Sequence, residues 1–185
     1  MKLLKNKKAL STVVTTLIIL VVSVLLATVV TFYAINVTTT RVQEESLFLT
    51  KQHVWYSSTY GAEAAIVIIN TGGKDVVIDK ITVRGQECDW TNVYYNVTTG
   101  SISSDLDFNT TLSNGGTITI GKTSYTFTQG TSGKDITLKS GYTMIVYIDD
   151  PDSISLNDIG TTVGITVFTA NAQYYKEANV QATSS

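Results

Sequence analysis

The chain has 185 residues, of which 43% are hydrophobic and 15% are charged, with 13 basic side chains against 15 acidic ones. Without the four lysines of residues 1–9, nine basic side chains face fifteen acidic ones, which argues against nucleic acid as a partner. A single cysteine, Cys88, excludes an intramolecular disulfide framework, and the length allows one apolar helix and one domain of about 125 residues.

The first predicted element is an apolar helix. A lysine cluster precedes residues 9–36, which contain no charged side chain, no glycine and no proline. Residues 10–35 as a helix would span about 39 Å, more than the ~30 Å hydrocarbon core of a bilayer. The run is too long for an ordinary secretory signal peptide, and bulky residues at 31–36 stand where a cleavage site needs small ones. The basic flank predicts a membrane-spanning helix with its N-terminus in the cytoplasm and the rest of the chain outside.

This apolar run contains seven serine and threonine residues but no charged side chain. They can bond to carbonyl groups of the preceding turn, and small side chains let helices approach closely. Two interpretations stay open: hydroxyls tolerated in a single-span anchor, or a helix that packs against copies of itself. The residues are Ser11, Thr12, Thr15, Thr16, Ser23, Thr28 and Thr31.

Helical spacing continues past the apolar run. Val37, Arg41, Glu44 and Phe48 fall on one stripe, so the helix is predicted to reach about Thr50. The sequence therefore divides into an N-terminal helix over residues 10–53 and a joint over residues 54–61.

From residue 62 the hydrophobic period changes from 3.6 to 2. Short alternating or apolar runs are separated by glycine-containing turns, which predicts strands and hairpins. The predicted strands cover residues 64–69, 76–83, 89–98, 117–120, 125–128, 136–138, 142–148 and 163–175. The predicted fold is α+β: a long N-terminal apolar α-helix followed by an antiparallel β-sandwich or barrel-like domain over residues 62–182, with a tail at 183–185.

A search for chemistry finds no catalytic, cofactor or metal site. His53, the single histidine, has no partner that the sequence marks, and Cys88 has neither a second cysteine nor a histidine to activate it. Four aspartates could offer oxygen ligands to calcium, but they lack the spacing of a calcium loop, and acidic loops are usually only solvated. These are Asp149, Asp150, Asp152 and Asp158. The glycine pairs at 72–73 and 115–116 read as turns, so the sequence indicates a protein that is not an enzyme.

Three N-x-Thr sequons begin at Asn36, Asn96 and Asn109. On an external domain they are candidate acceptors of N-linked glycans. Asn109 lies in a predicted loop and ranks first, Asn96 lies at a strand end, and Asn36 lies on the helix and ranks last.

The junction Lys7-Lys8-Ala9-Leu10-Ser11-Thr12, followed by the long apolar run, resembles the class III signal sequence of archaeal type IV pilins. The resemblance is specific over about residues 5–35 and architectural over 62–182. It implies that a prepilin peptidase removes residues 1–9 by cutting between Ala9 and Leu10, and that the helix is retained. Bacterial pilins usually carry a glutamate at the fifth mature position, which is Val14 here.

The resemblance implies a structural subunit of an extracellular filament for adhesion or surface contact. The helix would first span the cytoplasmic membrane. The subunit would then polymerise with other copies through this helix, with the help of the pilus assembly machinery. Archaellins share this layout and are the second candidate. A membrane-anchored module that binds sugar or protein is the third. The sequence does not distinguish adhesion, motility, DNA uptake and a virus-receptor role, nor a major subunit from a minor one.

Overall fold

The computed structural model describes residues 7–42, 44–151 and 153–183. The chain forms two compact units, Met1–Gln43 and Glu44–Ser185. The predicted combination of one long apolar helix and a β domain is confirmed. Each unit is described by itself below.

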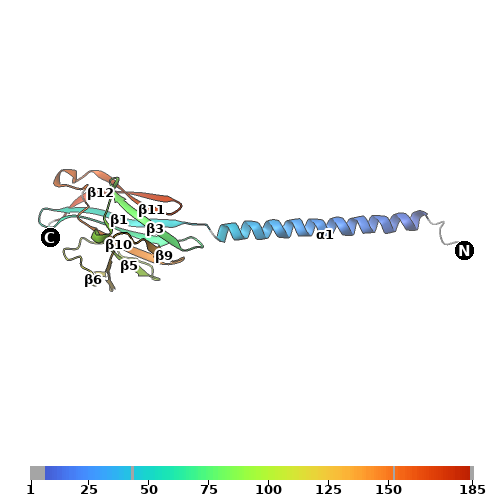
Figure 1. Cartoon of the computed structure of the whole chain (residues 1–185), viewed down its shortest axis with the longest axis horizontal. Coiled ribbons are helices and arrows are strands. Elements are labelled where there is room, and N and C mark those ends of the chain that lie inside the picture. Colours follow the sequence, from blue (N-terminus) through green and yellow to red (C-terminus); the bar gives the residue numbers. More distant parts are fainter. Residues whose placement is uncertain (1–6, 43, 152, 184–185) are drawn as a thin grey trace. The chain divides into compact units, whose positions relative to one another are not determined.

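The N-terminal unit contains one helix, α1 (Lys7–Val42), of 36 residues (Figure 1). Without glycine or proline the backbone hydrogen bonds run uninterrupted, as the sequence predicts. Ala9 and Leu10, the residues of the predicted cleavage site, both lie near the start of α1; of Ala9 the structure describes the backbone alone.

The prediction that the helix extends through residues 10–53 is wrong at its C-terminal end, and so is the predicted joint at 54–61. Strand β1 (Leu47–Ser57) occupies this region, and Leu47 and Leu49 are buried while Phe48 between them is exposed. This alternation is the two-residue period of a half-buried strand. The helical stripe of Val37, Arg41, Glu44 and Phe48 is a coincidence of spacing, overridden by pairing of β1 with strands from distant parts of the chain. The β domain therefore begins near residue 44 and not at 62.

The remaining elements alternate strands with turns and two short 3-10 helices, η1 (Trp90–Asn92) and η2 (Leu156–Asp158). The strands are β2 (Gly61–Asn70), β3 (Val76–Val83), β4 (Gln86–Glu87), β5 (Val93–Thr98), β6 (Thr117–Ile120), β7 (Thr123–Thr126), β8 (Thr128–Gln129), β9 (Ile136–Leu138), β10 (Thr143–Asp149), β11 (Thr162–Thr169) and β12 (Gln173–Thr183). Strand β12 thus extends to residue 183, the first residue of the predicted tail; residues 184–185 lie outside the described residues.

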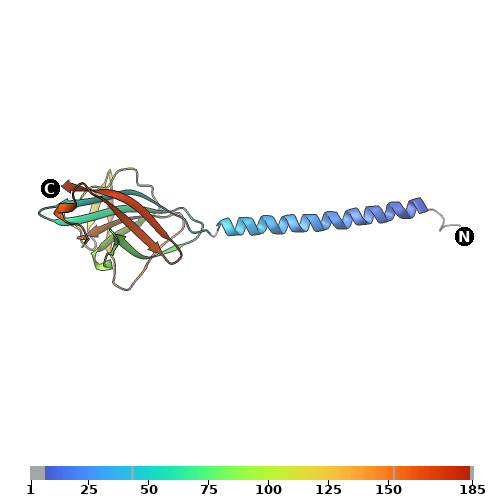
Figure 2. The ribbon, with the colours of Figure 1, turned by 90° about the horizontal axis from the view of Figure 1, so that it is seen from above.

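Ten strands form one curled sheet in the order β4-β3-β11-β12-β1-β2-β10-β5-β8, with β9 paired to β3. Within the described residues all pairs are antiparallel except β1 with β12, which run parallel. The hairpin of β11 and β12, orange and red in Figure 2, joins the two halves of the sheet through this parallel pair. Strands β6 and β7 form a separate hairpin.

Two hydrophobic cores lie on opposite faces of the central strands β2 and β10. Even-numbered residues such as Ile66 and Val146 enter the larger core, which the curled sheet forms with β3, β11 and β12. Odd-numbered residues such as Val67 and Tyr147 enter a second core with Phe127 and Leu106. Both faces of these two strands are therefore buried, which explains why they read as nearly continuous apolar runs.

Candidate functional site

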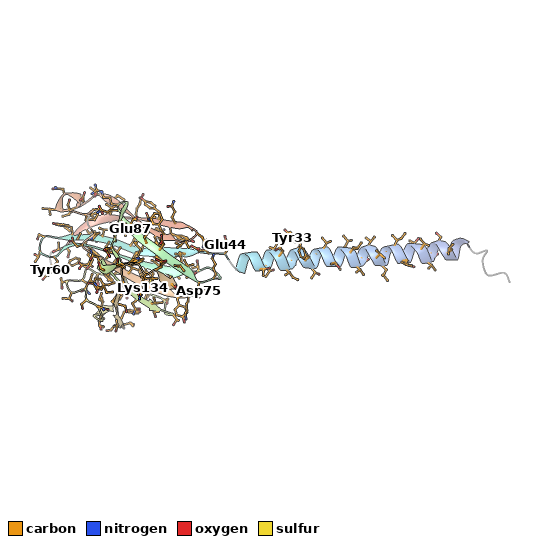
Figure 3. All side chains as sticks on the ribbon, in the orientation of Figure 1. Tyr33, Glu44, Tyr60, Asp75, Glu87 and Lys134 are labelled. Atoms are coloured by element: carbon orange, nitrogen blue, oxygen red, sulfur yellow. The ribbon has the colours of Figure 1, made fainter. Side chains whose placement is uncertain are left out.

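The first candidate site is the surface of α1. Every described side chain from residue 10 to residue 39 is exposed, and the large apolar ones are exposed by 41% (Val37) to 71% (Phe32 and Tyr33). Figure 3 shows these side chains, Tyr33 among them, projecting on all sides of the helix. By length and composition this is the one helix among the described residues that could cross a membrane. An apolar surface of this size requires a cover of lipid or protein.

Seven hydroxyl groups of α1 are satisfied within the helix. Most donate to the carbonyl oxygen four residues earlier, for example Thr28 to Val24 at 2.8 Å and Ser23 to Ile19 at 2.7 Å. The others of this kind are Thr15, Thr31, Thr38 and Thr39, and Thr16 bonds to the carbonyl oxygen three residues earlier. These donors are thus compatible with apolar surroundings, since none of them needs water.

The second candidate region is residues 101–112, called the strap below, which covers the second core. Its apolar residues pack inward: Leu106 is buried, and Ile102, Phe108 and Leu112 are partly buried against the same cluster. The sequence predicts no strand over these residues, and the structure has none there either.

Four contacts hold alternate residues of the strap to strands β1, β2 and β10. Lys51 Nζ donates to the carbonyl oxygen of Ser103 at 3.0 Å, and His53 Nε2 lies 2.9 Å from Asp105 Oδ1. The Tyr147 hydroxyl donates to the carbonyl oxygen of Asp107 at 3.1 Å, and the backbone N–H of Asn109 donates to Glu63 Oε1 at 3.0 Å. This two-residue spacing gives the strap a fixed register on the sheet.

His53 is a residue of β1 and not of the predicted helix. Its ring stacks on Trp55 with the centroids 5.1 Å apart, and its hydrogen bond holds the pKa of Asp105 below the ordinary value. In the described residues it belongs to no group of metal-ligating side chains.

Glu63 is a titratable residue that sequence analysis missed. It lies on β2, is only 2% exposed, and pairs across the sheet with Asp149 of β10. Burial raises its pKa from 4.5 to about 8; the Asn109 N–H opposes this shift and Asp149 adds to it. The signal was a single glutamate beside the apolar run of residues 64–69. A protonated carboxyl at neutral pH is the expected state of such a group.

Among the described residues, Asp149, Asp150 and Asp158 belong to no group of side chains that could hold a metal ion. Asp158 accepts hydrogen bonds from Ser155 and pairs with Arg84 at 2.6 Å, contacts that lower its pKa. Asp149 is partly buried on β10 with a raised pKa, caused first by burial and then by Asp150. Asp152 lies outside the described residues.

The three sequons lie in different surroundings. Asn109 is half-buried in the strap, and its Oδ1 accepts the Thr111 N–H at 2.9 Å. Among the described residues its Nδ2, the atom that would carry a glycan, has no hydrogen-bond partner. Asn96 Nδ2 instead donates to Thr126 at 2.7 Å, and Asn36 is an exposed residue of the apolar helix.

Cys88 is half-buried against the larger core. Cys88 therefore packs as a small apolar side chain would.

No protein-family model matches the sequence, and the comparison with curated proteins also gives no match. Among solved structures, the ligand-binding region of serine-glutamate repeat protein A of Enterococcus faecium aligns with 77% of this chain and 99% of that chain. The aligned residues are 16% identical and the TM-score is 0.27, below the level that indicates a shared fold.

Proposed function

We propose that the chain is a structural subunit of an extracellular filament resembling archaeal type IV pili, and that it polymerises through α1. The observation that carries this proposal is the exposed apolar surface of residues 10–39 on a helix whose hydroxyl groups are largely satisfied internally. The β domain has its own two cores and needs no cover from such a helix. The activity proposed is assembly and not catalysis.

The driving force is the removal of apolar surface from water. At about 25 cal/mol per Å², each 1,000 Å² that neighbouring helices cover contributes roughly 25 kcal/mol before the entropic cost of association. Contacts of this kind carry no charge, so filament stability is expected to depend little on salt. A head-to-tail contact that does not close on itself would generate a helical polymer.

We propose that maturation begins with a cut between Ala9 and Leu10 by a prepilin peptidase. The lysines before Ala9 would hold the N-terminus in the cytoplasm, and the helix would remain in the membrane until assembly. The decisive experiment determines the N-terminal residue and the assembly state of the native protein. Filaments whose subunits begin at Leu10 support the proposal, whereas detergent-soluble monomers with an intact lysine cluster contradict it.

Substitution at the cleavage site provides a second test. Ala9→Phe places a bulky side chain where the peptidase is proposed to need a small one, so it should abolish cleavage and filaments. Ala9→Gly keeps the position small and should allow both. Normal filaments from the Ala9→Phe variant would show that the site is wrong.

A membrane-anchored binding module is the alternative, because a helix of this length and composition also satisfies the requirements for a single membrane span. It predicts monomers that stay in the membrane with residues 1–9 attached. The same N-terminal and assembly measurements separate the two functions.

We propose Asn109 as the preferred acceptor of an N-linked glycan. The support is its available Nδ2, in contrast to that of Asn96, which is already bonded to Thr126. Intact-mass measurement should show the glycan lost in Asn109→Gln and retained in Asn96→Gln and Asn36→Gln. Loss in Asn96→Gln alone would contradict this assignment.

A further inference from the structure

A small hollow lies between the start of the strap and the β6–β7 hairpin. Its volume is about 270 Å³, slightly below the usual range of ligand pockets, so it suits only a small ligand. Polar side chains from both segments line it: Ser101, Ser103, Ser104, Lys122, Thr123 and Tyr125. None of the residues that line the hollow belongs to the sequon at Asn109.

The polar side chains that line the hollow have no partner within the described part of the protein. Among the described residues, none of the six side chains makes a hydrogen bond or an ion pair within the protein. Elsewhere on the same hairpin, hydroxyl groups pair with each other, as Thr119 does with Ser124 at 2.9 Å. Five residues with hydroxyl groups and one lysine therefore line one concavity, and their side chains have no internal partners among the described residues.

The walls of the hollow are fixed by contacts outside it. Lys51 holds the carbonyl oxygen of Ser103, and Ile120 is buried in the second core beneath the hairpin. Gly121 turns the hairpin with φ of 64°, and a Cβ at this position would lie 2.1 Å from Ser104 Oγ. The strap and hairpin therefore pack closely enough that only glycine fits, which gives the hollow a preformed shape.

We infer that this hollow binds one pyranose unit that carries a carboxylate, such as a uronic acid at the end of a surface polysaccharide. Lys122 pairs with the carboxylate, while the serine, threonine and tyrosine hydroxyls bond to ring hydroxyls. Apolar contact comes from Ile102 and Ile120. A phosphate or sulfate group is a weaker match, because sites for these groups favour bidentate arginine or several cations, and this hollow has a single lysine. The inference concerns the β domain and does not rest on filament assembly.

Titration of the full-length chain in micelles tests the inference. The detergent must contain no sugar or phosphate group, and ligand contact is followed by saturation-transfer NMR. Methyl glucuronide is expected to bind with Kd of about 1 mM, as is typical of a ligand of this size. Methyl glucoside, its neutral counterpart, and inorganic sulfate should bind at least about tenfold more weakly, because each lacks part of the recognised chemistry.

Two substitutions locate the site. Lys122→Gln should weaken methyl glucuronide binding about tenfold or more through loss of the charged hydrogen bond. Lys134→Gln removes an exposed lysine on another loop, labelled in Figure 3, and should leave the affinity unchanged. Ser101→Leu places a bulky side chain at an exposed residue of the lining and should abolish binding, and unchanged tryptophan fluorescence would show that the domain remains folded.

Three results would overturn the inference: no saturable binding at ten times the expected Kd, equal binding of the neutral glycoside, or undiminished binding by Lys122→Gln. Because the measurement uses monomers in micelles, it is independent of the filament proposal. Binding by a chain that never forms filaments would contradict only the latter.

Discussion

The helix α1 and the central strands of the β domain are both strongly apolar, but they are covered in opposite ways. Strands β2 and β10 bury both faces inside the chain, whereas every described side chain of α1 from residue 10 to 39 is exposed. Composition alone does not distinguish these segments. The difference lies in periodicity and partners. The strands pair with neighbours of the same chain, whereas the side chains of α1 are exposed.

Polar groups show the same contrast. In α1, hydroxyls bond within one helical turn, so the helix can enter apolar surroundings as a unit. In the β domain, polar groups such as Glu63 and His53 bond to residues more than forty positions away and define tertiary structure. The stability of the domain should therefore depend on contacts within the domain. Under the filament proposal, the stability of the helix should depend on assembly.

The largest expected effect is a charge placed in α1. Leu20→Glu puts a carboxylate in the middle of the apolar surface and should abolish filaments, since an unpaired charge is costly in either lipid or a helix bundle. The free energy of unfolding of the β domain should change by less than about 0.5 kcal/mol. Both tryptophans, Trp55 and Trp90, lie in the domain, so their fluorescence reports its unfolding alone.

Leu20→Ile is the matched control and should assemble normally, with filaments measured by sedimentation and electron microscopy. Filaments from Leu20→Glu would mean that α1 is not the assembly surface. A destabilised domain would mean that the two units are coupled.

A cavity in the second core should have the reverse effect. Phe127 is 1% exposed and packs edge-on against Tyr147 with ring centroids 5.5 Å apart. Phe127→Ala should lower the free energy of unfolding of the domain by about 3–5 kcal/mol, measured by denaturant titration. Phe48→Ala, at a phenylalanine that is 52% exposed, should cost far less. Equal costs at the two positions would contradict the assignment of the second core.

The pH dependence of the domain should identify Glu63. Its pKa is raised in the folded state, so between pH 4.5 and about 8 the folded chain holds a proton that the unfolded chain has lost, and stability falls as pH rises. From pH 5 to pH 7 this loss is on the order of 2–3 kcal/mol. Glu63→Gln keeps an oxygen that can accept the Asn109 N–H and removes the titration.

Glu63→Gln should therefore flatten this fall, and denaturant titrations at pH 5, 6 and 7 measure the difference between the two proteins. Glu87→Gln, at an exposed residue of β4, is the control and should follow the wild type. Parallel pH profiles of Glu63→Gln and wild type would show that Glu63 does not titrate in this range.

The sequence predicts strands best where the pattern is local. The predictions for residues 76–83, 117–120 and 136–138 coincide with β3, β6 and β9, because each run alternates or is bounded by glycine turns. The helix end was wrong because residues 37–48 suit both periods, and the choice is made by pairing of β1 with β2 and the distant β12.

The candidate sites divide in the same way. The apolar surface of α1 is evident from composition, since consecutive residues define it. The strap and the hollow beside it depend on contacts such as Lys51 with Ser103 and Glu63 with Asn109, which join residues 52 and 46 positions apart. No local pattern encodes such pairs, so the sequence revealed Asn109 as a sequon but not its neighbours.

The smallest expected effect tests what the hydroxyls of α1 do. Thr28→Val replaces a hydroxyl that donates to the Val24 carbonyl oxygen with a methyl group of similar size. If this hydroxyl bonds only within its own helix, Thr28→Val should change the free energy of filament disassembly by less than about 0.5 kcal/mol per subunit, as measured by denaturant titration. Thr28→Leu enlarges the side chain and should weaken assembly if position 28 allows close helix approach. A clear loss in Thr28→Val would instead indicate that this hydroxyl bonds to a neighbouring helix, because the valine keeps the volume and removes only the donor.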